Sequence, residues 1–151
     1  SPFVVYINKN GKEFLISQMG IGVSQVIPII IESVFTLLSE SDTVLLLQQP
    51  ELHLHPIAQA ALGEFFYEMS IRGAKYVIET HSDFLIDRYR AKMREEVDKA
   101  KFKRPISILY CQKKEDGNHY QEVEVNNDGE LVDPPEDYKK FFIKETIRTM
   151  F

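Results

Sequence analysis

Short apolar runs alternate with longer amphipathic stretches through the middle of the chain. Residues 43–47 and 75–79 have the pattern of short β-strands, and a helical pattern follows each run, starting at Pro56 and at Ser82. A further helix is predicted over residues 24–38, ahead of the first of these strands. The order strand, helix, strand, helix predicts parallel strands joined by right-handed crossovers.

The predicted helix ends follow from local residue chemistry. Ser24 is expected to be the N-cap of the first helix, with Pro28 in its first turn. This helix is apolar on most faces, so we expect it to be buried. Pro56 suits the first position of the second helix, and the Arg72-Gly73 pair suits its end.

A β-hairpin is predicted at each end of this region. The first joins residues 3–7 and 13–16 through an Asn-Gly turn at residues 8–11, and the second joins residues 106–112 and 120–125. A last helix is predicted over residues 136–150. The predicted fold class is therefore α/β, with a parallel sheet flanked by helices and a β-hairpin at each end.

Composition narrows the class of protein. A length of 151 residues with 44% hydrophobic residues favours one domain with a proper core. The net charge of −5 argues against bulk electrostatic binding to nucleic acid. The single cysteine, Cys111, cannot form an internal disulfide, no apolar run is long enough to span a membrane, and no signal peptide is evident. We expect a cytoplasmic protein without membrane contact.

Polar clusters follow both central strands where each strand ends. They occupy residues 48–55 and 79–82 and contain amides, carboxylates and histidines. In open α/β sheets, ligands bind beyond the carboxyl ends of the strands. A ligand site is therefore expected at this edge.

Three segments in this order resemble the C-terminal half of an ABC-type ATPase head. They are GIGVSQVIPII (20–30), LLLQQPELHLHP (45–56) and VIETHSDFLI (77–86). The group includes the RecF, SMC and OLD families. The chain looks closest to bacterial AAA-like ATPases with a C-terminal domain of unknown function, several of which are linked to phage defence. The implied fold is the C-terminal part of a P-loop NTPase.

The resemblance implies that ATP and Mg²⁺ are cofactors. Residues 20–25 match the signature loop, which in the family faces the γ-phosphate held by the partner head, in a head-to-tail homodimer around ATP. The residues carried over for cofactor binding are Gly20, Gly22, Ser24, Gln25 and Gln48. Backbone N–H groups at a helix start favour an anion, which suits this role.

The Walker B strand of the family corresponds to residues 45–49, and here the sequence departs from the pattern. The family ends this strand with two acids, whereas Gln48 and Gln49 are amides. An amide is a poorer Mg²⁺ ligand than a carboxylate and cannot accept a proton. Glu51 is the nearest carboxylate, so Gln48 and Glu51 are the candidate Mg²⁺ ligands.

The resemblance makes His81 the switch histidine that acts on the γ-phosphate and the attacking water. The candidate catalytic set is therefore Gln49, Glu51 and His81. His53 and His55 are expected to be mainly architectural, forming the turn before the second helix.

A Walker A loop requires a Gly-x-x-x-x-Gly-Lys-Ser/Thr run, and the sequence contains none. The resemblance therefore implies an N-terminal ATPase half that carries this loop, in the same or a separate chain. The chain alone is expected to be inactive, and the complete protein to hydrolyse ATP. Within a single domain over 1–151, the expected parts are a hairpin (1–18), the ATPase core (19–104) and a hairpin plus helix (105–151).

Two other functions remain open. Glu51, His53, His55 and His81 are a plausible zinc set for a metal-dependent hydrolase. Alternatively, the amides at Gln48 and Gln49 suit a non-catalytic interaction module. A DNA contact is conceivable through basic residues after His81, but interspersed acids favour a solvated helix face. Those basic residues are Arg88, Arg90, Lys92, Arg94, Lys99, Lys101, Lys103 and Arg104.

Overall fold

The computed structural model of the protein describes residues 6–15, 20–39, 42–96, 106–135 and 138. The chain divides into two compact units, residues 1–92 and residues 93–151. Four predicted features lie outside the described residues: the start of the first strand at residues 3–5, the end of the second strand at residue 16, the basic residues beyond position 98, and the last helix apart from Tyr138.

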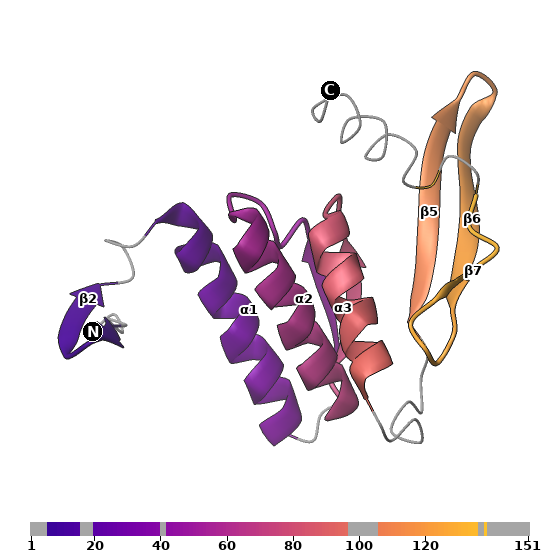
Figure 1. Ribbon diagram of the computed structural model, residues 1–151. Coiled ribbons are helices and arrows are strands. Elements are labelled where there is room, and N and C mark those ends of the chain that lie inside the picture. The colour runs from indigo at the N-terminus through magenta and orange to yellow at the C-terminus, as the bar shows by residue number, and fades with distance from the viewer. Residues whose placement is uncertain (1–5, 16–19, 40–41, 97–105, 136–137, 139–151) are drawn as a thin grey trace, which may run out of the picture. The chain divides into compact units, whose positions relative to one another are not determined.

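The first unit begins with an antiparallel hairpin and continues into the predicted α/β region (Figure 1). In the hairpin, β1 (Tyr6–Lys9) pairs with β2 (Lys12–Leu15), and the turn residues Asn10 and Gly11 have φ values of 53° and 77°. These left-handed conformations suit an Asn-Gly turn, so the predicted hairpin is confirmed. The following elements are α1 (Ile21–Leu38), β3 (Val44–Gln48), α2 (Pro56–Ile71), β4 (Lys75–Glu79) and α3 (Asp83–Glu95).

The two central strands pair in parallel, as predicted. Leu45 lies opposite Tyr76 and Leu47 opposite Ile78. Helices α1, α2 and α3 lie side by side (Figure 1), and the core joins all three to the strands. At its centre are buried Leu62, Phe66 and Leu85, and packed around them are Val26, Ile29, Leu47, Leu54, Phe65, Tyr76, Ile78 and Tyr89.

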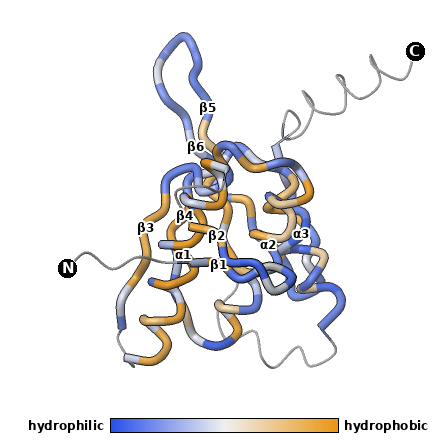
Figure 2. The backbone as a smooth tube through the Cα atoms, turned by 90° about the vertical axis from the view of Figure 1, so that its left-hand side faces the viewer, coloured by the Kyte–Doolittle hydropathy of each residue, from blue (hydrophilic) through white to orange (hydrophobic). Residues whose placement is uncertain are grey.

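The prediction that α1 is buried is wrong for one face of the helix, and β3 also has an exposed apolar face. Figure 2 shows that α1 and β3 are largely hydrophobic. The exposed fractions are nevertheless 63% for Phe35, 78% for Leu38 and 76% for Leu46. Their inner faces pack on the core, whereas no described residue covers their outer faces. Ser33, a polar residue of α1, is buried, and its hydroxyl donates a hydrogen bond to the Ile29 carbonyl at 2.7 Å.

By length and composition, α1 is apolar enough to cross a membrane, because its mean hydropathy over 18 residues is 1.9. The expectation from the sequence that no apolar run is long enough to span a membrane is therefore corrected. Pro28 and Glu32 do not lower the mean hydropathy of α1 below that of a membrane-spanning helix. A single such helix is weak evidence, since core helices meet the same test. Here Val26 and Ile29 pack against the core.

The start of α1 also differs from the prediction. Gly20 is the N-cap and Ser24 lies inside the helix, where its hydroxyl donates to the Ile21 carbonyl at 3.0 Å. Pro28 is consequently in the interior of α1 rather than in its first turn. Glycine is an acceptable N-cap even without a side-chain hydrogen bond, which is why the helix can begin four residues early.

Gly63 lies in the middle of α2, a position where glycine costs about 1 kcal/mol relative to alanine. A Cβ atom at this position would lie 2.2 Å from the Leu85 carbonyl oxygen of α3. Glycine is therefore required for the close contact between α2 and α3.

Gly63→Ala is expected to lower the free energy of unfolding by about 1–3 kcal/mol, because the helices must separate. Chemical denaturation measures the change. Ala61→Ser, at an exposed position of α2, is the control and should stay within about 0.5 kcal/mol of the parent. Equal stabilities for Gly63→Ala and the parent would contradict the packing.

The second unit is a meander of antiparallel strands. Strand β5 (Ser107–Lys114) pairs with β6 (Gly117–Val125), and β7 (Leu131–Val132) pairs with the end of β6. The predicted second hairpin is confirmed, whereas β7 was not predicted from the sequence. Val123 and Val125 are buried.

Candidate functional site

The carboxyl ends of β3 and β4 lie together, because the strands are parallel and in register. Gln48 is directly opposite Glu79, and the Gln49 N–H donates to the Glu79 carbonyl at 2.8 Å. Paired residues share a face of the sheet, so the Gln48 amide and the Glu79 carboxylate are neighbours, both exposed. Sequence analysis missed Glu79 as a site residue, because only the observed register places it opposite Gln48.

The loop after β3 has an unusual backbone. Gln49 and His53 have φ values of 45° and 64°, in the left-handed region that non-glycine residues rarely adopt. Hydrogen bonds hold this shape, from the Leu52 N–H to the Gln49 carbonyl and from the Leu54 N–H to the Glu51 carbonyl, both at 3.0 Å. Such conformations cost about 1–3 kcal/mol each and often occur at functional sites.

Glu51 connects this loop to the one after β4. Its side chain is buried, at 7% exposure, and Oε1 accepts a hydrogen bond from the His81 N–H at 2.9 Å. The other oxygen, Oε2, is also buried and has no hydrogen-bond partner among the described residues. The structure thus brings Glu51 and His81 together across 30 residues of sequence.

His81 has a fixed backbone and an exposed side chain. Besides the bond to Glu51, the neighbouring Ser82 N–H donates to Thr80 Oγ1 at 3.0 Å. A helix was predicted to start at Ser82, and Ser82 does cap α3, because its Oγ accepts from the Leu85 N–H at 3.1 Å. In the described part of the chain the His81 ring makes no hydrogen bond or ion pair, so it is available to a ligand.

The start of α1 packs directly on the loop after β3. A Cβ atom on Gly22 would lie 2.7 Å from the His53 carbonyl oxygen and 2.8 Å from Leu54 Cδ2. Gly22 therefore has a packing role, and its binding role stays a prediction. Gly20 and Gln25 are exposed near the same helix end, whereas the Ser24 hydroxyl is turned to its own helix.

The zinc set predicted as an alternative is not assembled. Among the described residues, no three His, Cys, Asp or Glu side chains form a group that could hold a metal ion. His55 is occupied as the N-cap of α2, where its Nδ1 accepts from the Ile57 N–H at 3.4 Å. The architectural role expected for His55 is confirmed.

The donors at the strand ends suit Mg²⁺ better than zinc. Gln48, Glu51 and Glu79 offer amide and carboxylate oxygens, the ligands that Mg²⁺ prefers. Mg²⁺ usually takes only one or two protein carboxylates beside water and phosphate, so a small oxygen set is sufficient. The unpartnered Glu51 Oε2 is a buried acceptor that such a site would use.

Three of the basic residues on α3 form ion pairs within the first unit. Arg88 contacts Glu64 at 3.2 Å, Lys92 contacts the same carboxylate at 3.5 Å, and Arg90 contacts Asp87 at 2.9 Å. These acidic partners offset the positive charge. The arrangement agrees with a solvated helix face, and a DNA contact stays a prediction.

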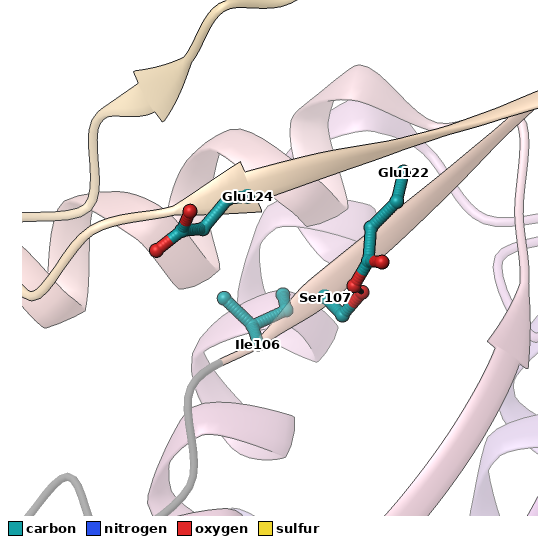
Figure 3. A pocket seen from close by; sticks show the side chains of 4 residues that line it. All are labelled: Ile106, Ser107, Glu122 and Glu124. Carbon is teal, nitrogen blue, oxygen red and sulfur yellow. Dashed lines mark hydrogen bonds between the residues drawn. The ribbon is translucent and has the colours of Figure 1, made fainter.

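The second unit contains an open depression of about 410 Å³ on the β5–β6 hairpin (Figure 3). It is lined by Ile106, Ser107, Glu122 and Glu124, and Ser107 Oγ donates to Glu122 Oε1 at 2.6 Å. None of the predicted site residues lines it. The strand ends of β3 and β4 therefore remain the candidate site.

Comparisons with known proteins identify the family and the fold class of the chain. The profile of a family described as "AAA domain, putative AbiEii toxin, Type IV TA system" matches residues 3–87, more than half of the chain. No curated protein matches the sequence. A solved structure from work on ATP-driven dimerization and DNA-stimulated activation of SMC ATPases is similar at 15% identity, with a TM-score of 0.59. The match covers 98% of this chain and 74% of that chain, which confirms the predicted P-loop NTPase fold class.

Proposed function

Because the chain belongs to the family of AAA domains described as a putative AbiEii toxin of a Type IV TA system, we propose that it is the C-terminal portion of an ABC-type head that binds and hydrolyses ATP. Membership of this family identifies the chain as an ABC/AAA-type ATPase domain. The observation that carries the proposal is the hydrogen bond from the His81 N–H to Glu51 Oε1, at 2.9 Å. It joins the ends of neighbouring parallel strands, where α/β folds bind ligands.

In this proposal His81 contacts the γ-phosphate and orients the attacking water. Its backbone is fixed by Glu51 and its ring is exposed, which is what a preorganised donor requires. Gln49 lies at the position of the usual catalytic acid and cannot accept a proton. Glu51 is the nearby carboxylate proposed to take over that role or to hold the metal.

Gln48 and Glu51 are proposed to hold Mg²⁺, with Glu79 as a third oxygen donor opposite Gln48. When bound, Mg²⁺ neutralises phosphate charge. Gly20, Gly22, Ser24 and Gln25 are proposed to present the start of α1 to the phosphates of a nucleotide on a partner head. The contact between Gly22 and the loop after β3 supports this, because it fixes the helix end beside the site.

An N-terminal half carrying the Walker A loop is proposed as a partner, in the same or a separate chain. Support comes from the sequence, which lacks the Gly-x-x-x-x-Gly-Lys-Ser/Thr run, and from uncovered apolar surface. Val44, Leu46 and Val77 share the open face of the β3–β4 pair, with exposed fractions of 45%, 76% and 60%. A further layer of the same fold would bury this face.

The complete head is proposed to dimerise head-to-tail around ATP in the cytoplasm, in DNA-related or phage-defence machinery. Residues 19–104 are proposed as its ATPase core, between a hairpin over 1–18 and a C-terminal part over 105–151.

The isolated chain is expected to bind ATP weakly or not at all, because Walker A backbone N–H groups supply most phosphate contacts in related heads. Calorimetric titration with ATP and Mg²⁺ measures this. Low-micromolar affinity of the chain alone would contradict the proposed division of the site.

A further inference from the structure

Gln59 of α2 lies between the two loops of the candidate site and contacts both. Its Nε2 donates to the Leu54 carbonyl in the loop after β3, at 2.9 Å. Its Oε1 accepts a hydrogen bond from Ser82 Oγ in the loop after β4, at 2.6 Å. The two ends of one amide thus bridge segments that are 28 residues apart (82 − 54).

The chemistry of these partners fixes the orientation of the Gln59 amide. A backbone carbonyl only accepts, so the NH₂ group must face Leu54. Ser82 Oγ already accepts from the Leu85 N–H at 3.1 Å, and its one proton is free to bind Gln59. Each group of the Gln59 amide therefore has one specific hydrogen-bond partner. One of these partners, Ser82, is buried, with an exposed fraction of 5%.

The packing of α2 on α3 holds Gln59 in place. Gly63 is one turn further along α2, on the same face as Gln59. The backbone of Leu85 approaches Gly63 so closely that a Cβ atom there would lie 2.2 Å from its carbonyl oxygen. This contact sets the first turn of α3 beside α2, within reach of the Gln59 side chain.

We propose that Gln59 is a positioning residue that, together with Glu51, locks the loop carrying His81 to the loop after β3. Glu51 holds the His81 N–H and Gln59 holds the adjacent Ser82 hydroxyl, so the backbone is fixed on both sides of the exposed imidazole. The role in turnover rests on the proposed ATPase function, whereas the lock itself does not.

Amide hydrogen exchange of this chain tests whether the Gln59 side chain holds the two loops together, and the measurement needs no nucleotide. Gln59→Ala is expected to accelerate exchange of the His81, Ser82 and Leu85 amides about five- to thirtyfold, the effect of losing one or two ordinary hydrogen bonds. Gln59→Glu keeps an acceptor for Ser82 but places a second acceptor against the Leu54 carbonyl. It should accelerate exchange mainly in residues 49–54.

The matched control is Glu64→Gln. Glu64 also joins α2 to α3, through Arg88 and Lys92, but it contacts neither loop of the site. Its substitution should leave exchange in both loops unchanged. Unchanged exchange in Gln59→Ala, or equal acceleration in Glu64→Gln, would overturn the inference.

Steady-state kinetics of the complete head then test the positioning role. Gln59→Ala is expected to lower kcat about tenfold to a hundredfold with little change in KM for ATP, because a misplaced group costs rate rather than binding. Faster loop exchange with unchanged kcat would refute the positioning role. A parent head that hydrolyses no ATP would refute the proposed function, and the exchange measurement would still decide whether the lock exists.

Discussion

His81→Ala in the complete head is expected to lower kcat about a hundredfold to a thousandfold while nucleotide affinity changes little. The reason is that a preorganised donor acting on developing charge contributes mainly in the transition state. The His81 backbone is fixed through Glu51, and its exposed ring is available to a ligand. Removing the ring therefore removes the group proposed to contact the γ-phosphate, and the backbone of the loop keeps its position.

Single-turnover hydrolysis and equilibrium nucleotide binding, measured on the same variant, separate the two effects. His119→Ala is the matched control, because His119 is a surface histidine of β6 paired with Asp116 at 2.8 Å. It should leave both quantities unchanged. Loss of affinity at an unchanged rate in His81→Ala would count against the assigned role.

The second large effect is expected at Glu51. Glu51→Gln retains an oxygen acceptor for the His81 N–H, so the loop should stay folded, but it removes the carboxylate. If Glu51 accepts the proton or holds Mg²⁺, turnover should fall about a hundredfold or more. The buried, unpartnered Oε2 supports this role, because leaving such an atom unsatisfied costs stability unless a ligand uses it.

Gln49→Glu supplies the complementary test, since it introduces an acid at the position that the proposal assigns to the catalytic carboxylate. The glutamate has no β-branch, so the left-handed backbone at residue 49 tolerates it as well as glutamine. Turnover is expected to rise about tenfold or more if proton transfer limits the rate. In a non-catalytic module, neither Gln49→Glu nor Glu51→Gln would change the background rate, and a robust parental activity unchanged by Glu51→Gln would contradict our assignment.

Local signals predicted much of this fold. The Asn-Gly hairpin, the Ser82 cap and the start of α2 at Pro56 depend on residues close in sequence, and the parallel pairing of β3 and β4 follows from the order of strands and helices. The start of α1 was predicted four residues too late because Ser24 is a better N-cap than Gly20 in isolation, whereas the actual start brings Gly22 against the loop after β3.

Burial and long-range side-chain contacts were not predictable in the same way. An apolar helix such as α1 has the same sequence pattern whether its outer face is covered by this chain or by another. Gln59 and Glu51 reach partners 23 and 30 residues away, and no periodicity encodes such bonds. Glu79 became a site residue only once the register placed it beside Gln48.

The most direct test of the account is steady-state ATP hydrolysis by this chain alone, by the half carrying the Walker A loop alone, and by the two together. We predict hydrolysis only when both halves are present, and its loss when this chain carries His81→Ala. Hydrolysis by this chain alone, or an assembled head whose activity does not depend on His81, would contradict the claim that the ends of β3 and β4 form half of an ATPase site.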